Sequence, residues 1–456
     1  MRKLLMIGAA AVTVVGLGAA TTAGQTPRNE AYRLLGLFGD ALTIVERDYV
    51  VPVDDKKLVE AALQGMMGAL DPHSSYMPLK DYGELRERTE GQYSGVGLTI
   101  SSEGGLVKII SPMDGGPAAR AGVQAGDVIS SIEGQSASGL TVSQVSEKLR
   151  GAAGTNVKVT FLRDGEEPRE VTLTREIIKI DSVTGRVEGD YGVLRISTFN
   201  ENTGRELSDA IAKLKAENPA LKGYVIDLRN NGGGLLDAAI AVSDTFLERG
   251  EIVSQRGRQP NQILRYAAKP GDLTGGLPLV VLVNYGSASA SEIVAGALKD
   301  HQRATIVGLT SFGKGSVQSV IPLRGGADGA LSITTARYYT PSGASIQKIG
   351  IEPDLEVARS FAEAKIVSRS NFIYSEAAYA TALDASIGAE RKGPHTPHEA
   401  PSEAYDKEKD YQLERAFDVL RAGGKLTQLA AAPEGIVVTA PGTAMAAVET
   451  SDAPSE

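Results

Sequence analysis

The chain has 456 residues, of which 42% are hydrophobic and 23% charged, so it is long enough for two or more domains with cores of their own. Its formal net charge is −9 and it has no long basic run, which gives no support to a nucleic-acid partner. It contains no cysteine, which excludes disulfides, thiolate catalysis and cysteine metal sites. Its four histidines are too few to favour a histidine-rich metal site.

Residues 1–24 have the three parts of a secretory signal: the basic pair Arg2-Lys3, an apolar run, and small residues that end at Ala23. We expect cleavage near Ala23 and export across a membrane. An uncleaved anchor is the alternative, because the apolar run is close to the roughly 17-residue lower limit for a membrane span.

Residues 25–90 form a helical N-terminal segment. Apolar residues recur at helical spacing between residues 29 and 49, and a second helical pattern follows at 55–70 before the turn DPHSSYM (71–77). Such an apolar stripe can pack on its own domain or on a second subunit. The stripe of the first helix consists of Leu34, Phe38, Leu42 and Val45.

Residues 91–178 have short β-patterns separated by glycine turns, with helical patterns at 117–122 and 141–151, and should fold as a separate module. YSGVGL (93–98) presents backbone N–H groups before a strand, an arrangement suited to a carboxylate. In their order, YSGVGL, PAARAG, GDVISSIEG and TVSQVSEKL resemble a PDZ domain, which binds an extended peptide C-terminus as an added strand. The resemblance implies that Val145 lines the peptide pocket and that the peptide is held by the amides of Gly95, Val96, Gly97 and Leu98.

Residues 179–357 alternate strand and helix patterns, which predicts an α/β layer with a mostly parallel sheet. Functional sites in such sheets form at the carboxyl ends of the strands. Two sequences follow apolar strands in this way, RNNGGG (229–234) and GSASAS (286–291). We therefore expect the site where these two turns meet.

The three serines of GSASAS lie where a strand gives way to a helix, so each could be a helix cap or a nucleophile. A nucleophilic serine needs a base. His301 is poorly placed for that role, at the far end of the same helix, and fits a helix C-terminus better. Lys314 lies in a glycine-flanked loop after the next strand, and it is either an ordinary surface lysine or a base whose pKa is lowered by burial.

The loop around Lys314 also nearly matches a phosphate-binding loop, because Gly308 and Gly313-Lys314 have the required spacing after a strand. Gly315 stands where a serine or threonine would hold magnesium, and the following SVQSVIPL has a β-pattern instead of a helical one. These two departures argue against nucleotide binding.

VNYGSASASEIVAGAL, followed by RATIVGLTSFGKGSVQ, resembles the carboxyl-terminal processing peptidases (peptidase family S41), which are secreted serine proteases with an inserted PDZ domain. The resemblance extends from DPHSSYM through DLRNNGGG to IEPD at 351–354. It implies a ClpP/crotonase-like α/β core at 179–357, with Ser289 as nucleophile, Lys314 as base and Gln318 orienting the lysine. An offset of four residues places Lys314 and Gln318 on one face if the stretch is extended.

The family's oxyanion hole pairs the amide that follows the nucleophile, here Ala290, with a glycine amide after the DLRNN strand. Gly232, Gly233 and Gly234 are the candidates for that second amide. Ser287 and Ser291 are then expected to be a turn residue and a cap. The chain departs from the family at Gly232, where the family often has proline, and this leaves the register of the amide open.

Residues 358–430 are rich in Ala, Ser, Pro and Glu and contain one amphipathic helix, at 411–420, with Leu413, Phe417 and Leu420 on one face. Residues 431–456 hold four acidic residues and no basic one, and we expect them to be disordered. Neither stretch carries a candidate catalytic group.

These features predict a periplasmic serine endopeptidase that captures C-terminal tails with residues 91–178 and cuts them with Ser289 and Lys314, without cofactor or metal. The alternative is a non-catalytic PDZ scaffold that binds C-terminal peptides. The expected partners are proteins or peptides with free C-termini, and an activating adaptor protein is left open. The two amphipathic helices favour a homo-oligomer, although a helix packed on its own domain has the same stripe.

Overall fold

The computed structural model describes residues 26–369, 375–385, 391, 393, 397–403, 405, 409–429 and 436–438. The expected signal sequence, residues 1–24, lies outside these ranges. The chain divides into two compact units, residues 1–65 and 66–456. Within the described ranges no helix is both long and apolar enough to span a membrane.

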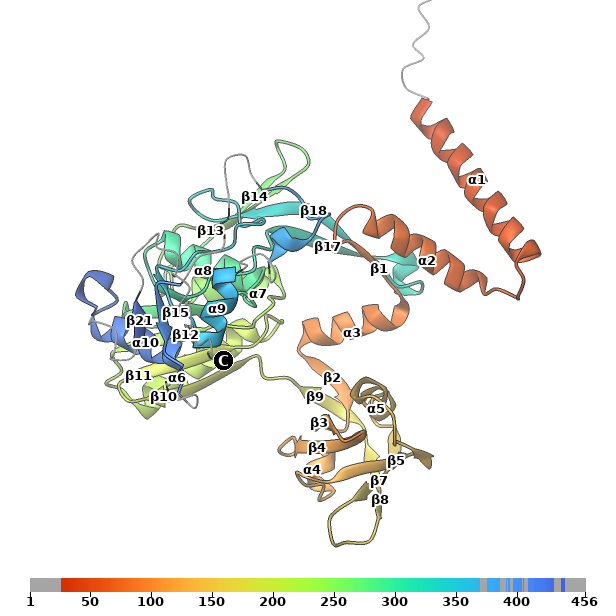
Figure 1. The fold of residues 1–456 in the computed structure, drawn as a ribbon, viewed down its shortest axis with the longest axis horizontal. Coiled ribbons are helices and arrows are strands. Elements are labelled where there is room, and N and C mark those ends of the chain that lie inside the picture. Colours follow the sequence, from red (N-terminus) through yellow and green to blue (C-terminus); the bar gives the residue numbers. More distant parts are fainter. Residues whose placement is uncertain are drawn as a thin grey trace, which may run out of the picture. The chain divides into compact units, whose positions relative to one another are not determined.

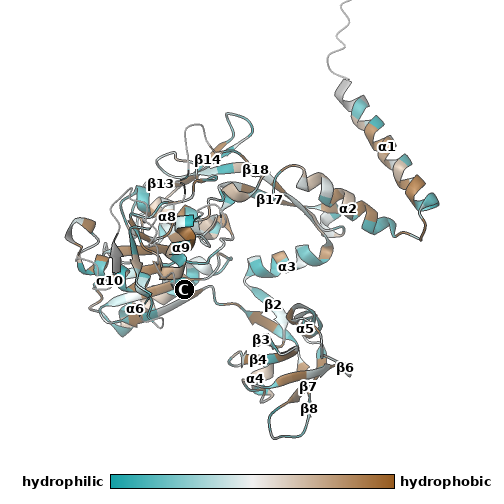
Figure 2. Cartoon of the chain, in the orientation of Figure 1, coloured by the Kyte–Doolittle hydropathy of each residue, from teal (hydrophilic) through white to brown (hydrophobic). Residues whose placement is uncertain are grey.

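The first unit contains α1 (Thr26–Asp48) and most of α2 (Asp55–Gly68), as the helical spacing predicts. Apolar and polar residues alternate in patches along α1 (Figure 2). The expected stripe lies on the surface of this unit, where the side chains of Leu34 and Phe38 are 49% and 45% exposed.

The PDZ-like module is an antiparallel sheet with two helices. Thr141 begins the second helix with a capping box: its hydroxyl accepts from the N–H of Gln144, and its own N–H donates to the Gln144 side chain. Buried apolar residues fill its interior, among them Val107, Ile129 and Val159. A further antiparallel pair, β2 with β9, lies at the two ends of the module. The elements are β2 (Gln92–Gly95), β3 (Leu98–Glu103), β4 (Leu106–Pro112), α4 (Pro117–Arg120), β5 (Val128–Ile132), β6 (Gln135–Ser136), α5 (Val142–Leu149), β7 (Asn156–Leu162), β8 (Arg169–Thr174) and β9 (Glu176–Lys179).

The core that follows contains a six-stranded sheet in the order β10-β11-β12-β15-β16-β19, in which only β10 and β11 are antiparallel. The predicted mostly parallel sheet is therefore confirmed. The central strands β12 and β15 are mostly apolar because both faces of the sheet are buried there, whereas the edge strand β10 is largely exposed. They are β10 (Val183–Glu188), β11 (Tyr191–Ile196), β12 (Gly223–Asp227), β15 (Leu279–Val283), β16 (Thr305–Gly308) and β19 (Leu355–Glu356).

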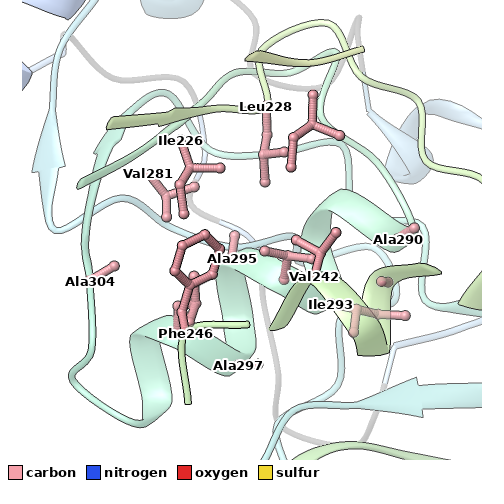
Figure 3. Packing of buried hydrophobic residues seen from close by; sticks show 14 of the residues in the cluster. Ile226, Leu228, Val242, Phe246, Val281, Ala290, Ile293, Ala295, Ala297 and Ala304 are labelled. Carbon is pink, nitrogen blue, oxygen red and sulfur yellow. The ribbon is translucent and has the colours of Figure 1, made fainter. Parts of the chain in front are cut away.

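Helices cover both faces of this sheet (Figure 1). On one face, α6 (Thr203–Glu217), α7 (Leu236–Asp244) and α8 (Ala290–Asp300) pack on alternate strand residues. Figure 3 shows this packing, with Ile226 and Val281 of the sheet close to Phe246.

The other face is covered by α10 (Tyr411–Arg421). Its residues Leu413 and Leu420 are 7% and 3% exposed. The apolar stripe at 411–420 therefore packs on its own domain and does not support self-association.

A second sheet has β18 (Ala330–Tyr339) at its centre. Three strands pair with β18: β1 (Ser75–Met77), β17 (Ser316–Pro322) and β13 (Glu251–Gly257). Strand β13 also pairs with β14 (Ile263–Ala267). This sheet thus joins the turn after the N-terminal helices to the strand that follows Lys314. The remaining elements are α3 (Leu79–Glu90), η1 (Leu323–Gly326), α9 (Phe361–Arg369), η2 (Glu376–Ala378), β20 (Glu399–Pro401), η3 (Leu426–Gln428) and β21 (Ile436–Val438).

Most of the tail expected to be disordered, residues 431–456, lies outside the described residues. The exception is β21, which pairs antiparallel with β20. The expectation is wrong for these three residues, because the β-branched sequence Ile-Val-Val favours a strand.

Candidate active site

Ser289 stands at the N-cap position of α8, directly after the turn that follows β15, with φ 56° and ψ −112°. A non-glycine residue at positive φ is strained, and such strain persists only where the surroundings impose it. Here the N–H of Ala288 donates to the carbonyl of Asn231 at 3.0 Å, and the N–H of Ser289 donates to the carboxylate of Glu292 at 2.7 Å. The backbone around the serine is therefore fixed from two directions.

The other two serines of the turn are fully buried, whereas Ser289 is half-buried. The hydroxyl of Ser287 accepts from the N–H of Asn284 at 3.0 Å and donates to the carbonyl of Leu228 at 2.9 Å, as expected of a turn residue. The expected cap at Ser291 is wrong, because α8 already begins at Ala290 and Ser289 holds the N-cap position. Among the three, only Ser289 is accessible to a substrate.

The glycine turn after β12 lies against the serine turn, as the sequence predicts. The hydroxyl of Ser291 donates to the carbonyl of Asn231 at 2.8 Å. A Cβ atom on Gly233 would lie 2.9 Å from the Cβ of Ser289 and 3.0 Å from the backbone nitrogen of Ala290. With φ +100° at Gly233, this approach requires glycine.

The three candidate glycines use their N–H groups differently. The N–H of Gly233 donates to Oδ1 of Asn231 at 2.9 Å. In the described part of the chain no acceptor faces the N–H groups of Gly232, Gly234 and Ala290. Gly232 and Gly234 are both exposed, and a Cβ atom on Gly234 would clash with the carbonyl oxygen of Phe199.

A buried arginine that the sequence analysis missed holds the start of the glycine turn. The guanidinium of Arg229, 8% exposed, donates to Asp227 at 2.8 Å and to Asp410 at 2.7 Å. Burial acts to raise the pKa of Asp410, but the bonds from Arg229 outweigh it and hold this pKa below its usual value. The end of β12 is thus tied to the start of α10.

Lys314 lies two residues before β17, and its side-chain nitrogen Nζ donates to Gln318 Oε1 and to the carbonyl of Ser316 at 3.2 Å. Burial lowers the pKa of Lys314, although the nearby carboxylates act to raise it. Because Lys314 is half-buried and bonded to Ser316 and Gln318, the alternative of a solvated surface lysine does not fit the structure. The loop leads into a strand and not a helix, which agrees with the argument against a phosphate-binding loop.

Gln318 lies beside Lys314, as the offset of four predicts. Its Nε2 donates to the hydroxyls of Ser316 and Thr334, both at 3.0 Å, while its Oε1 accepts from the lysine. Among the described residues no hydrogen bond joins the hydroxyl of Ser289 to the amine of Lys314. The structure links these two residues through a different side chain, Glu292.

Glu292 is fully buried and bridges the nucleophile turn and the lysine loop. Its Oε2 accepts from the N–H groups of Ser289 at 2.7 Å and Lys314 at 2.9 Å. Its Oε1 accepts from Ser311 Oγ and from the N–H of Gly313, both at 2.6 Å. Burial raises the pKa of Glu292 in spite of these four donors. The sequence analysis missed Glu292, although the spacing Ser289-x-x-Glu292 has the form of a capping box.

His301 is the C-cap residue of α8, and its Nε2 lies 2.7 Å from the carbonyl of Glu251. The expectation of a helix C-terminal residue is confirmed, and this histidine takes no part in the site.

In the PDZ-like module the predicted peptide-binding loop runs from Gly95, the last residue of β2, to Leu98, the first of β3. The carbonyls of Val96 and Gly97 accept from Ala118 at 3.1 Å and Met113 at 3.0 Å. Over the ranges that the structure covers, the N–H groups of Val96 and Gly97 have no acceptor.

The expected pocket residue Val145 is misassigned. It is 0% exposed and packs in the interior of the module, one turn from the buried Leu149. The helical period places both on the inward face of α5, so neither lines an open pocket. Val142 and Ser146 are half-buried on the adjacent part of α5.

The family model of peptidase family S41 matches residues 190–357, a PDZ domain model matches 108–163, and the model of the activating protease CtpB N-terminal domain matches 18–80. The carboxy-terminal-processing protease of Bartonella bacilliformis is 47% identical over 414 residues, which are 90% of this chain and 93% of that protein. The chloroplastic C-terminal processing peptidase of Tetradesmus obliquus is 37% identical over 67% of this chain and 69% of its own length. Among solved structures, the photosystem II D1 C-terminal processing protease is 35% identical and covers 70% of this chain and 92% of its own, with a TM-score of 0.41.

Proposed function

Because this chain belongs to the carboxyl-terminal processing peptidases, serine endopeptidases with a PDZ domain, we propose that it cuts proteins near free C-termini with Ser289 as nucleophile and Lys314 as general base. The observation that carries the proposal is the placement of Lys314. Burial lowers its pKa, and Glu292 ties its backbone to that of the only accessible serine of the turn.

The contacts of Lys314 suit a neutral amine. A neutral amine has two N–H groups and one lone pair, and two acceptors face this nitrogen, the carbonyl of Ser316 and Oε1 of Gln318. With both N–H groups engaged, the lone pair is free to take the proton of the Ser289 hydroxyl. Gln318 thus orients the base.

The reaction then follows from these groups. The oxygen of Ser289 attacks the scissile carbonyl carbon, and the oxyanion accepts from the N–H of Ala290 and from one of the two unpaired glycine amides, Gly232 or Gly234. Lys314 passes its proton to the departing amine. It then takes a proton from the water that hydrolyses the acyl-enzyme.

We propose that the PDZ-like module captures the substrate tail. The unpaired N–H groups of Val96 and Gly97 would hold the terminal carboxylate, and the extended tail would pair with β3. Val142 and Ser146, half-buried on α5, take the place of Val145 as residues beside the tail.

The cellular setting is a separate proposal. Export to the periplasm rests on residues 1–24, and the first residue of the mature protein, read by mass spectrometry, tests it. A chain that begins near Gly24 supports export with cleavage, whereas a chain that keeps its first residues supports an anchor.

Self-association rests on the exposed stripe of α1, and light scattering tests it. An activating adaptor stays a hypothesis that co-purification would test.

The cleavage test compares single serine variants of the full chain on a small reporter protein that ends in an apolar residue. Ser289→Ala should abolish cleavage but keep reporter binding. In the wild-type chain, mass spectrometry should find an acyl group on the peptide that contains Ser289. Ser287→Ala and Ser291→Ala should keep most activity, because a lost buried hydroxyl hydrogen bond costs about 1 kcal/mol. Binding without cleavage by the wild-type chain would favour the scaffold alternative.

A further inference from the structure

A chain of hydrogen bonds, called the line below, runs from Lys314 to the DPHSSYM turn, which has no part in the proposed reaction. Gln318 of β17 donates from Nε2 to the hydroxyl of Thr334 on β18 at 3.0 Å. That hydroxyl in turn donates to Oδ1 of Asp71 at 3.1 Å. Gln318 and Thr334 are direct partners in the register of the two strands.

Asp71 is 3% exposed, and its carboxylate is the acceptor in each of its hydrogen bonds to described residues. The N–H groups of His73 and Ser74 donate to its Oδ1 at 2.9 Å, and the hydroxyl of Ser74 donates to its Oδ2 at 2.7 Å. Burial acts to raise the pKa of Asp71, but these bonds and that from Thr334 outweigh burial and hold the pKa below its usual value. The side chain is therefore an ionised carboxylate at neutral pH.

An ionised carboxylate cannot donate, and this fixes the direction of each bond in the line. The hydroxyl proton of Thr334 points to Asp71, so a lone pair of Thr334 faces Gln318. Gln318 must then present Nε2 to Thr334 and Oε1 to the lysine. With the amide reversed, an N–H of Gln318 would occupy the lone pair that Lys314 needs as a base.

We propose that Asp71 is a positioning residue that acts through Thr334 to determine which atom of Gln318 faces Lys314. The inference rests on the proposed roles of Ser289 and Lys314. It gives the DPHSSYM turn, which follows the N-terminal helices, a direct part in keeping the base available.

A purely structural role is the competing explanation, because Ser74 Oγ also accepts from the N–H of Thr334 at 3.2 Å and so ties the turn to β18. That role predicts lower stability without any change in the titration of the base. The two explanations therefore differ in the pH dependence of turnover. Three carboxylates act on Lys314, those of Glu376, Glu292 and Asp71, and His73 of the turn contacts Glu376 at 2.7 Å.

The test is Thr334→Val in the full chain, which removes the hydroxyl and keeps a β-branched side chain in a strand. We expect kcat to fall about tenfold or more with KM unchanged, since the amide of Gln318 is no longer oriented. The pH of half-maximal turnover should also move down, because an ammonium on Lys314 loses a fixed acceptor. Thr334→Ser keeps the hydroxyl and should restore both kcat and the profile.

Thr335→Val is the matched control on the same strand, because Thr335 is exposed and, among the described residues, its hydroxyl contacts Ser319 alone, at 2.8 Å. It should leave kcat and the profile unchanged. Asp71→Asn is the second variant and serves if Thr334→Val does not fold. The amide of Asp71→Asn can donate to Thr334 and so reverse the direction of the hydrogen bonds from Thr334 to Gln318. The loss of kcat should therefore equal that of Thr334→Val. Loss of the negative charge should again lower the pH of half-maximal turnover.

Wild-type kcat and pH profile in Thr334→Val, with Lys314→Arg inactive, would overturn this inference and leave the proposed mechanism intact. An active Lys314→Arg enzyme would overturn both. A folded Thr334→Val protein that loses thermal stability but keeps the wild-type profile would assign the line a structural role only.

Discussion

The protease core and the PDZ-like module hold their working groups in opposite ways. In the core, the buried carboxylate of Glu292 holds the two proposed reacting residues, because all four of its hydrogen bonds are to atoms of the serine turn or the lysine loop. In the module, the working N–H groups of Val96 and Gly97 have no acceptor among the described residues. Bond making needs fixed geometry, whereas capture of a tail needs donors that are still open.

Ion pairs do not separate the two regions. The pairs of Arg229 with Asp227 in the core and of Arg163 with Asp127 in the module are both largely buried. Lys222 with Asp190 in the core and Lys158 with Glu170 in the module are both more than half exposed. Exposed pairs contribute little to stability, so their substitution should matter little in either region.

The largest expected effect is at Lys314. Lys314→Arg should lose activity as completely as Lys314→Ala, about a thousandfold or more, because arginine keeps the charge but cannot give up its proton. Lys299→Arg is the control, since Lys299 pairs with Asp354 at 3.0 Å at the far end of α8. Substantial hydrolysis by Lys314→Arg at pH 8, measured by peptide cleavage, would contradict the assignment of the base.

The pH dependence of the wild-type enzyme sharpens the same point. Burial lowers the pKa of Lys314 below that of the unfolded chain, so the folded protein releases this proton at a lower pH. Turnover should rise with pH along a single deprotonation and then level off. Folding stability should rise over the same window, from the folded to the unfolded pKa, because the unfolded chain binds the extra proton there. A rate that falls with rising pH in this window would contradict the mechanism.

The sequence indicated the candidate reacting residues more directly than the groups that support them. Ser289 and Gln318 came from the resemblance to the peptidase family, and Lys314 also from its place in a glycine-flanked loop. The structure brings Lys314 and Gln318 together. Glu292 was within reach of the same analysis, because it lies three residues after Ser289. The contact of Asp71 with Thr334 joins residues 263 positions apart and depends on the register of β18, which local patterns do not contain.

The error at Val145 has a different cause. The sequence analysis took its role from the resemblance to PDZ domains without testing the face of the helix. Val145 and Leu149 are four residues apart, and both are buried on one side of α5. The helical period shows that Val145 and Leu149 share a face, but whether that face is the interior depends on the packing of the module.

The second prediction concerns Glu292. Glu292→Gln replaces one carboxylate oxygen with an NH₂ group, which would face two hydrogen-bond donors that now point at that oxygen. This conflict should shift Ser289 or Lys314 and lower kcat about tenfold to a hundredfold. Glu363→Gln is the matched control, because Glu363 is also a buried glutamate whose pKa is raised by burial, but it contacts the backbone of Arg359 instead of the site. Equal kcat in both variants would show that Glu292 does not position the reacting groups.

The third prediction concerns the interior of the module. Val145→Ala should destabilise it by about 2 kcal/mol, since two buried methyl groups and their packing are lost. Hydrogen exchange of residues 91–178 in the full chain measures this loss. Val142→Ala, on the half-buried part of α5, should leave exchange unchanged and weaken peptide binding instead. If Val145→Ala weakened peptide binding without faster exchange, Val145 would line the pocket after all.

The smallest expected effect is the preference for a free peptide C-terminus. A carboxylate held by the unpaired N–H groups of Val96 and Gly97 gains charge-assisted hydrogen bonds that an amide cannot make, so free peptides should bind about tenfold more tightly than their amides. Calorimetry on the full-length Ser289→Ala chain measures both affinities without cleavage. The preference should be lost in Gly97→Ala, because Gly97 has φ +70° and an added Cβ would strain the loop that aims these amides. If the wild-type loop bound the free peptide and its amide equally tightly, the open N–H groups of the loop would not hold the tail. The module would then not differ from the core in keeping its donors open for a ligand.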